Sequence, residues 1–329
     1  MRTGARVMPP PGSTDKVTAT ISEKEAAPFV QTPGGTHMNK GPVQLTSLID
    51  INDPDEVLDE IRTIVRLVWP DFDFTHVDAA AADVIRLFTG TYPGFRTCNL
   101  QYHDLTHTLA VTLAVTRLLH GAVESGQTLS ARDWNIGVIS ALMHDTGYIQ
   151  RDGDTAGTGA KYTLTHIGRS IAFIHEYYRE HPAFRGNLKT FQAILECTGV
   201  YTCIADIHFE STNTALLGRI LGTGDLLGQM SDPRYLEKLP DLYNEFVEGG
   251  ITAFASPLDL LQKTLPFYTA TLTRFEEDFG EANRFARPHF RTRWGIDADL
   301  YAQAMEANMA RLEDILTHHA GDFPSVLGR

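Results

Sequence analysis

Apolar residues recur at helical spacing along most of this chain, from Asp53 to the C-terminus. The first such segment begins with Asp53 as a helix N-cap and Pro54 as the first helical residue. Ser130 and Asp133 have the spacing of a capping box ahead of another apolar helix. Runs of helices without alternating strands predict an all-α, multi-helix bundle.

The expected helices end at turn-forming residues or at breaks in the apolar pattern. Gly121 is expected to close the third helix, and the fourth is expected to stop near Gly147. Residues 199–207 carry a short, isolated strand signal of β-branched and aromatic residues. We expect helices at about residues 53–68, 78–88, 105–119, 130–147, 163–179, 187–197, 213–230, 256–280 and 297–318.

The N-terminal segment differs in composition from the rest of the chain. Residues 1–45 are rich in Pro, Gly, Thr, Ser and Lys and lack sustained apolar periodicity. We therefore expect a flexible tail at residues 1–45, followed by a single catalytic domain at residues 46–329. The C-terminal helices are expected to cap the active site or to form a homodimer face.

The net charge limits which binding partners are expected, and the cysteines indicate the cellular compartment. The formal net charge is −13, which argues against binding to nucleic acid or to an anionic membrane surface. The longest apolar runs fall short of 18 residues, so no membrane span is expected. Cys98, Cys197 and Cys203 show neither a zinc-type pair nor a disulfide framework, which favours a reducing, cytoplasmic setting.

Two short segments carry histidines in patterns suited to metal binding. His103 and His107 lie four residues apart at a helix start, and therefore on one face of that helix. His144 and Asp145 follow the apolar residues of a helix that we expect to be buried. A buried aspartate is costly unless its charge is neutralised. A divalent cation bound by the His-Asp pair would neutralise it.

Two further residues are candidates for the same site. Asp225 is an acidic residue within an otherwise apolar helical pattern, and nearby Asp232 is its main competitor. His166 follows the glycine-rich loop at residues 151–160. The residues leave open whether His166 binds metal or is a core histidine. His175 is interpreted as a structural histidine, whereas His120 and His289 are interpreted as solvated.

The order of these motifs resembles that of a known superfamily. A histidine, a His-Asp pair and a later aspartate resemble the metal signature of HD-domain phosphohydrolases. The Tyr102-His103-x-x-x-His107 segment, with His144-Asp145 following 37 residues after His107, is similar to cyclic-nucleotide phosphodiesterases. This resemblance implies an HD-type helical bundle and that Asp145 bridges to a second metal. It also implies a general-acid role for His103 and a first-metal ligand set of His107, His144, Asp145 and Asp225.

The chain also departs from that family. Asp104 stands where the phosphodiesterases have asparagine, and Tyr148 stands where they have a further histidine. The pairing of His-Asp-Thr-Gly with a later His166 is similar to the bacterial HD-GYP type, in which such a histidine ligates the second metal. The His-His and GYP motifs of that type are missing here. Whether His166 or only water completes a second metal site therefore stays open.

The resemblance implies a metal-dependent phosphohydrolase. The expected reaction is the hydrolysis of a phosphoester, in particular a nucleotide phosphodiester, by a metal-activated water. The expected cofactors are one or two divalent ions, drawn from Mg, Mn, Zn, Fe and Ni. Two other functions stay open: a catalytically silent HD-fold nucleotide sensor and a di-iron HD oxygenase.

Candidates for substrate contacts are less specific. Gln229, or Gln262 with Phe267, could contact a nucleotide base, as a glutamine and a phenylalanine do in the phosphodiesterases. Arg169 and Lys161 could contact a phosphate, although surface charge is the commoner explanation for such residues.

Overall fold

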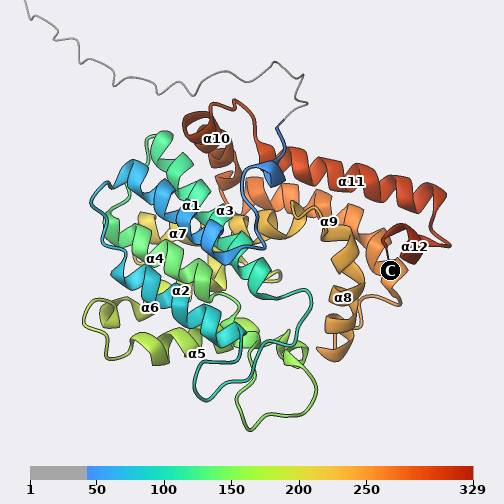
Figure 1. Ribbon diagram of the computed structural model, residues 1–329, viewed down its shortest axis with the longest axis horizontal. Coiled ribbons are helices and arrows are strands. Elements are labelled where there is room, and N and C mark those ends of the chain that lie inside the picture. Colours follow the sequence, from blue (N-terminus) through green and yellow to red (C-terminus); the bar gives the residue numbers. More distant parts are fainter. Residues whose placement is uncertain (1–42, 329) are drawn as a thin grey trace, which may run out of the picture. The chain divides into compact units, whose positions relative to one another are not determined.

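The computed structural model describes residues 43–328, and this part of the chain is all-α (Figure 1). It contains no strand, and its one β-bridge joins Phe95 and Arg151. The α-helices are α1 (Pro54–Val68), α2 (Thr75–Phe88), α3 (Leu105–Glu124), α4 (Ala131–Met143), α5 (His166–Tyr178), α6 (Leu188–Glu196), α7 (Thr212–Met230), α8 (Tyr235–Glu248), α9 (Pro257–Glu277), α10 (Ala286–Trp294), α11 (Leu300–His318) and α12 (Phe323–Val326). Short 3-10 helices occupy Leu45–Ser47, Thr146–Tyr148, Gly159–Tyr162, Arg185–Asn187, Ile204–Asp206 and Ala282–Phe285.

The prediction of an all-α bundle is confirmed, and so are two helix starts. The Asp53 side chain accepts hydrogen bonds from the backbone N–H groups of Asp55 and Glu56. Ser130 and Asp133 form the expected capping box at the start of α4. The expected flexible tail falls outside the described residues except for Val43, Gln44 and Leu45.

Several sequence predictions about local structure are wrong. The strand expected at residues 199–207 is replaced by turns and the 3-10 helix Ile204–Asp206. Helix α3 continues beyond Gly121 to Glu124. A Cβ at Gly121 would clash with the Phe285 carbonyl, so this glycine serves helix packing and does not end the helix. Helices α8, α10 and α12 were not expected. Pro240 lies in the interior of α8, which disfavours a helix prediction there. Helices α10 and α12 are short, with nine and four residues.

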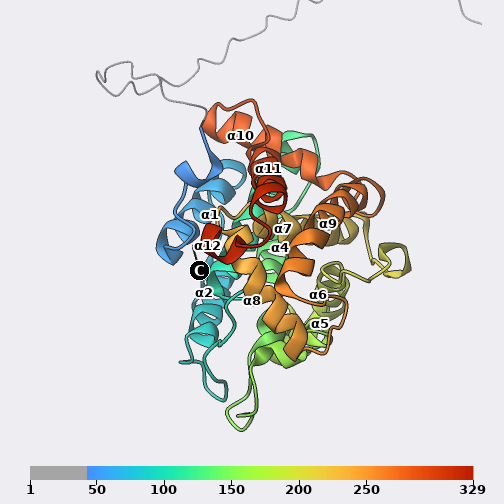
Figure 2. The same cartoon turned by 90° about the vertical axis from the view of Figure 1, so that its right-hand side faces the viewer.

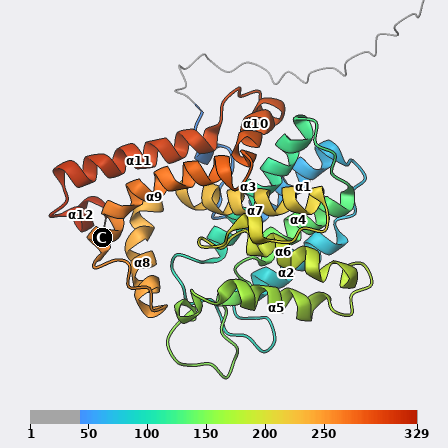
Figure 3. The same cartoon turned by 180° about the vertical axis from the view of Figure 1, so that it is seen from behind.

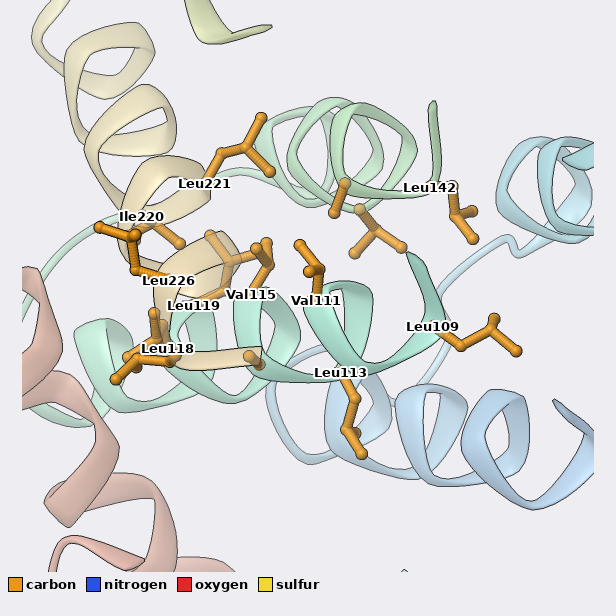
Figure 4. Close-up of a cluster of buried hydrophobic side chains, with 14 of the residues drawn as sticks. Leu109, Val111, Leu113, Val115, Leu118, Leu119, Leu142, Ile220, Leu221 and Leu226 are labelled. Atoms are coloured by element: carbon orange, nitrogen blue, oxygen red, sulfur yellow. The ribbon is translucent and has the colours of Figure 1, made fainter. Parts of the chain in front are cut away.

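Helix α3 is the centre of the bundle. All of its residues from His107 to Ala122 are buried except Ala110, as expected of a helix that is apolar on every side. It packs against α1, α4, α7 and α10. Figure 4 shows Leu109, Leu113 and Leu119 pointing away from α3 in different directions.

Small residues bring α7 unusually close to α3. A Cβ at Gly224 would lie 2.6 Å from Val115 Cγ2, and one at Gly228 would lie 3.0 Å from Val111 Cγ2. Both separations are shorter than an ordinary van der Waals contact. The two glycines therefore allow the close approach that places Asp225 beside the first turn of α3.

The C-terminal helices form the other side of the domain. Helix α11 lies along α9, and α8 also packs against both of these helices, as Figures 2 and 3 show from two directions. Helix α8 reaches back to the 3-10 helix Gly159–Tyr162. No helix in residues 43–328 has the length and apolarity needed to cross a bilayer.

His120 and His289 are buried rather than solvated, contrary to the sequence interpretation. Their Nδ1 atoms lie 3.2 Å apart, on α3 and α10. Burial, together with the positive charges of Arg117, His120 and Arg293, lowers the pKa of His289 to about 2. Burial also lowers the pKa of His120, although Glu124 opposes this.

We predict that Gly224→Ala destabilises the protein by about 1–3 kcal/mol, because the new methyl group meets Val115 in a packed interface. Combining it with Val115→Ala should recover part of that loss, measured as a favourable coupling in a double-mutant cycle of urea unfolding. The control is Gly168→Ala on α5, where a Cβ would meet open space. Additive effects of the two core substitutions would contradict the close approach.

We predict that His289 makes the free energy of unfolding depend on pH below the pKa that this histidine has in the unfolded chain. The folded protein keeps His289 neutral down to about pH 2, whereas the unfolded chain takes up a proton below about pH 6.5. The stabilisation is therefore fully present above pH 6.5 and declines as the pH falls, by up to about 1.4 kcal/mol per pH unit. His289→Gln can still hydrogen-bond His120. In this variant the free energy of unfolding, measured in urea, should change less between pH 6.5 and 4.5 than in wild type. Equal slopes for both proteins would refute this.

Candidate metal centre

Three helices bring together the residues that the sequence predicts to bind the first metal. His107 lies in the first turn of α3, His144 is the C-cap of α4, and Asp145 follows it. Asp225 lies within α7. One ligand atom from each of His107, His144 and Asp225 lies within 4.8 Å of the others, so this group could hold a metal ion.

The distances among these side chains leave room for a cation. His107 Nε2 lies 3.4 Å from both Asp145 Oδ2 and Asp225 Oδ1. His144 Nε2 lies 3.3 Å from Asp145 Oδ2 and 3.8 Å from Asp225 Oδ1. Within residues 43–328, three of these buried atoms have no hydrogen-bond partner: His107 Nε2, His144 Nε2 and Asp145 Oδ2. Buried polar atoms are rarely left unpaired, and a shared cation would satisfy all three.

A backbone contact orients His144 for ligation. Its Nδ1 lies 2.8 Å from the Ala141 carbonyl oxygen. Because a carbonyl only accepts, Nδ1 carries the proton and the Nε2 lone pair faces the two aspartates. A fixed tautomer of this kind is typical of metal-binding histidines.

The electrostatics of the cluster also favour a positive charge. Burial disfavours the charged form of His107, but Asp145 and Asp225 outweigh it and raise its pKa to about 10. Burial likewise opposes charge on His144, and Asp145 raises its pKa. Burial would raise the pKa of Asp145, yet the neighbouring histidines hold it well below its ordinary value. The two carboxylates therefore require cationic neighbours.

The structure places His166 next to Asp145. His166 Nε2 lies 3.8 Å from Asp145 Oδ1, whereas His107 and His144 face Asp145 Oδ2. His166 Nδ1 lies 2.7 Å from the Thr163 carbonyl oxygen, so its Nε2 lone pair is also available. The two oxygens of Asp145 thus face different histidines, which is the arrangement that a bridging carboxylate needs.

The loop after Asp145 is tied to α5, and this holds His166 in position. The Gly147 N–H donates to Ser170 Oγ at 2.8 Å. Arg169 Nε donates to the Gly147 carbonyl at 2.6 Å, and its Nη2 donates to the Ile149 carbonyl at 2.9 Å. Arg169 therefore has a structural role in this loop. Lys161, the other candidate for a phosphate contact, forms an ion pair with Asp154.

His103 has a buried carboxylate partner that sequence reasoning missed. His103 Nδ1 lies 2.7 Å from Glu245 Oε2. The other oxygen of Glu245 accepts the backbone N–H groups of Gln101 (3.1 Å) and Tyr102 (2.8 Å). Glu245 lies on α8, a helix that the sequence pattern did not predict, and no local signal pointed to it.

Aromatic stacking completes the placement of His103. Its ring stacks on Tyr148 with centroids 4.5 Å apart, and Tyr148 stacks on His166 with centroids 4.4 Å apart. Tyr148 therefore lies between the two rings and holds His103 and His166 on either side of it.

Asp104 and Gln229 hydrogen-bond to two of the clustered residues, His107 and Asp225. The Asp104 carboxylate caps α3 by accepting the His107 N–H at 2.7 Å. Gln229 donates to Asp225 Oδ1 at 2.8 Å and accepts from the Tyr102 hydroxyl at 3.1 Å. The amide of Gln229 is thus engaged with the protein, which does not favour its interpretation as a contact for a nucleotide base.

The remaining candidates lie outside the cluster. Asp232, the competitor of Asp225, instead pairs with Lys238 at 3.0 Å. Gln262 is exposed on α9. The side chains of His103, Asp225 and His166 are 13%, 13% and 18% exposed, whereas His107, His144 and Asp145 are almost fully buried. His103, Asp225 and His166 are therefore the members of this group that solvent reaches.

One family model matches this part of the chain. It is described as Npun_R2479-like and matches residues 93–156 and 152–280, which include every residue of the candidate centre. No curated protein and no solved structure matches the chain.

We predict that a divalent metal stabilises the folded protein through this cluster. A metal that binds the folded chain alone adds about 2.7 kcal/mol at a hundred times its Kd, which should raise the Tm by about 5 °C or more. Thermal melts with Mn, Mg, Ni, Zn or Fe, and then with EDTA, measure this shift. His144→Gln should abolish it, whereas His208→Gln on the exposed surface should keep it. An unchanged shift in His144→Gln would exclude this site.

Proposed function

We propose that this chain, which belongs to the Npun_R2479-like family, is a metal-dependent phosphohydrolase that cleaves a phosphodiester of a nucleotide. The observation that carries the proposal is the convergence of unpaired, buried His107 Nε2, His144 Nε2 and Asp145 Oδ2. Beside them, His103 is held by a buried carboxylate. The resemblance to the HD-domain phosphohydrolases supports the same assignment.

The proposed ligands divide into two groups around Asp145. His107, His144, Asp145 and Asp225 would hold the first divalent ion, and Asp145 with His166 would contribute to a second. Such ions lower the pKa of a bound water and neutralise the charge of a phosphoryl group. The nitrogen and oxygen donors here suit Mn, Fe, Ni or Zn, and carboxylates with water also suit Mg.

His103 is the proposed general acid, which protonates the leaving oxygen of the ester. Glu245 accepts from His103 Nδ1 and thereby fixes the tautomer and orientation of the ring. Because the same carboxylate holds the backbone of residues 101 and 102, it also sets where His103 enters the site. Glu245 is a positioning residue in this proposal.

The choice of a diester rests on the resemblance to the phosphodiesterases, whereas the acid indicates an alkoxide leaving group. A poor leaving group such as a sugar alkoxide needs a proton as its bond to phosphorus breaks. The partial exposure of the His103 side chain would allow it to meet such a leaving group. The nucleotide character of the substrate rests on the family resemblance.

The proposed site predicts activity that depends on Asp145. Wild type should hydrolyse bis-p-nitrophenyl phosphate with at least one of Mn, Mg, Ni, Zn or Fe, and Asp145→Ala should fall to the background rate. Hydrolysis of p-nitrophenyl phosphate alone would indicate a monoesterase. Undiminished activity in Asp145→Ala would show that the site assignment is wrong.

The proposed acid predicts a dependence on the leaving group. His103→Gln should slow a diester with an alkoxide leaving group by about 10²–10⁴-fold. The same variant should slow p-nitrophenolate release by much less, because that group leaves without protonation. Glu245→Gln should show a smaller loss of the same kind, and both variants should keep their metal. His318→Gln, on the exposed surface, is the control; a uniform loss across substrates would contradict an acid role.

The two rival functions give different results in the same assays. A catalytically silent sensor would bind nucleotides and show no turnover with any metal. A di-iron oxygenase would contain iron and consume oxygen. Either result would replace the phosphohydrolase proposal.

A further inference from the structure

Three exposed apolar side chains belong to segments that adjoin His166. Leu164, two residues before His166, is 67% exposed, and Val200 and Tyr201 are 56% and 87% exposed. Tyr201 is the most exposed large apolar side chain among residues 43–328. We call Leu164, Val200 and Tyr201 the apolar patch. Apolar side chains kept in water forgo the stabilisation that burial provides, and where they gather they mark binding surfaces.

Packing of Gly199 against α5 brings Val200 and Tyr201 close to His166. A Cβ at Gly199 would lie 3.3 Å from Ile167 Cδ1, and Ile167 follows His166 in α5. The Thr202 N–H donates to the Gly199 carbonyl at 3.1 Å. Val200 and Tyr201 are therefore the two central residues of a tight turn, which presents their side chains to solvent.

Arg274 holds the same turn from α9. Its Nη2 donates to the Gly199 carbonyl at 2.7 Å. Burial lowers the pKa of Arg274, and the charges of Asp278 and Asp225 oppose this shift. The guanidinium is therefore close enough to Asp225 to interact with its charge. The turn thus lies near both Asp225 and His166, two members of the candidate metal centre that solvent reaches.

The patch matches the organic part of a substrate. A phosphoester that binds at the metal centre extends its organic group toward solvent, past the residues that surround the exposed ligands. Tyr201 offers a free aromatic face, on which any nucleobase can stack, and Leu164 and Val200 add aliphatic contacts. We propose that the apolar patch binds the base of a nucleotide substrate, with Tyr201 as the stacking residue. This inference rests on the proposed phosphohydrolase function and adds the residue that recognises the nucleotide.

The test compares diesters that share the p-nitrophenolate leaving group and differ in the retained group, which is thymidine, methyl or hexyl. Wild-type kcat/KM should be highest for the thymidine ester. Tyr201→Ala should lower that value about tenfold through a higher KM and should affect the methyl ester much less. Tyr201→Phe, which keeps the ring, should restore most of the loss. Leu67→Ala, at an exposed apolar residue of α1, is the control and should match wild type.

Two results would overturn the proposal while leaving the phosphohydrolase function in place. One is an equal loss for the thymidine and methyl esters in Tyr201→Ala, or no loss for either. The other is a preference for the hexyl ester that Tyr201→Ala removes, because the patch would then bind hydrocarbon rather than a base.

Failure of the proposed function gives a different result, which is turnover of none of the three esters or turnover that survives in Asp145→Ala. Titration calorimetry with thymidine 5′-monophosphate then decides the patch without turnover. Tyr201→Ala should weaken this binding about tenfold. Equal binding to wild type and Tyr201→Ala, or no binding to wild type, would overturn the proposal.

Discussion

Two carboxylates buried against imidazoles are the constraint on which this structure depends. Asp145 and Asp225 lie within 3.3–3.8 Å of His107 and His144 in the middle of a helical bundle. The chain brings them together because Gly224 and Gly228 let α7 approach α3 closely. A buried carboxylate requires a cation nearby, and unpaired nitrogen and oxygen atoms converge where that cation would lie.

Helix α3 contributes to two buried polar regions of different character. At its N-terminal end, His107 faces two carboxylates. Further along, Arg117 lies over the rings of Phe290 and Tyr301, and burial lowers the pKa of both His120 and His289. An apolar helix has little ability to solvate charge, so the two carboxylates of the first region require a partner of opposite charge. We propose that this partner is a divalent metal.

The sequence was most informative where local pattern determines structure. The N-cap at Asp53 and the capping box at Ser130 follow from neighbouring residues, and both are confirmed. The residues proposed as metal ligands stood out because His144, Asp145 and Asp225 interrupt apolar helical patterns. The structure brings these together with His107 and places His166 beside Asp145. Whether these residues bind metal stays a prediction.

Features that depend on tertiary packing could not be predicted from the sequence. Glu245 reaches His103 from α8, a helix hidden by Pro240, and their separation of 142 residues gives no local signal. The burial of His120 and His289 depends on the packing of α10 against α3. Gln229 looked like a contact for a base, but its amide instead joins Asp225 to Tyr102. In each case the burial or the hydrogen bonding of a polar side chain depends on residues that are distant in the sequence.

The most direct test of the central claim is anomalous X-ray diffraction from crystals of the full-length protein grown with Mn²⁺. The account predicts a manganese peak bounded by His107, His144, Asp145 and Asp225, with a second peak between Asp145 and His166 if two ions bind. A crystal without a peak at the first position, at saturating Mn²⁺ and neutral pH, would contradict the account.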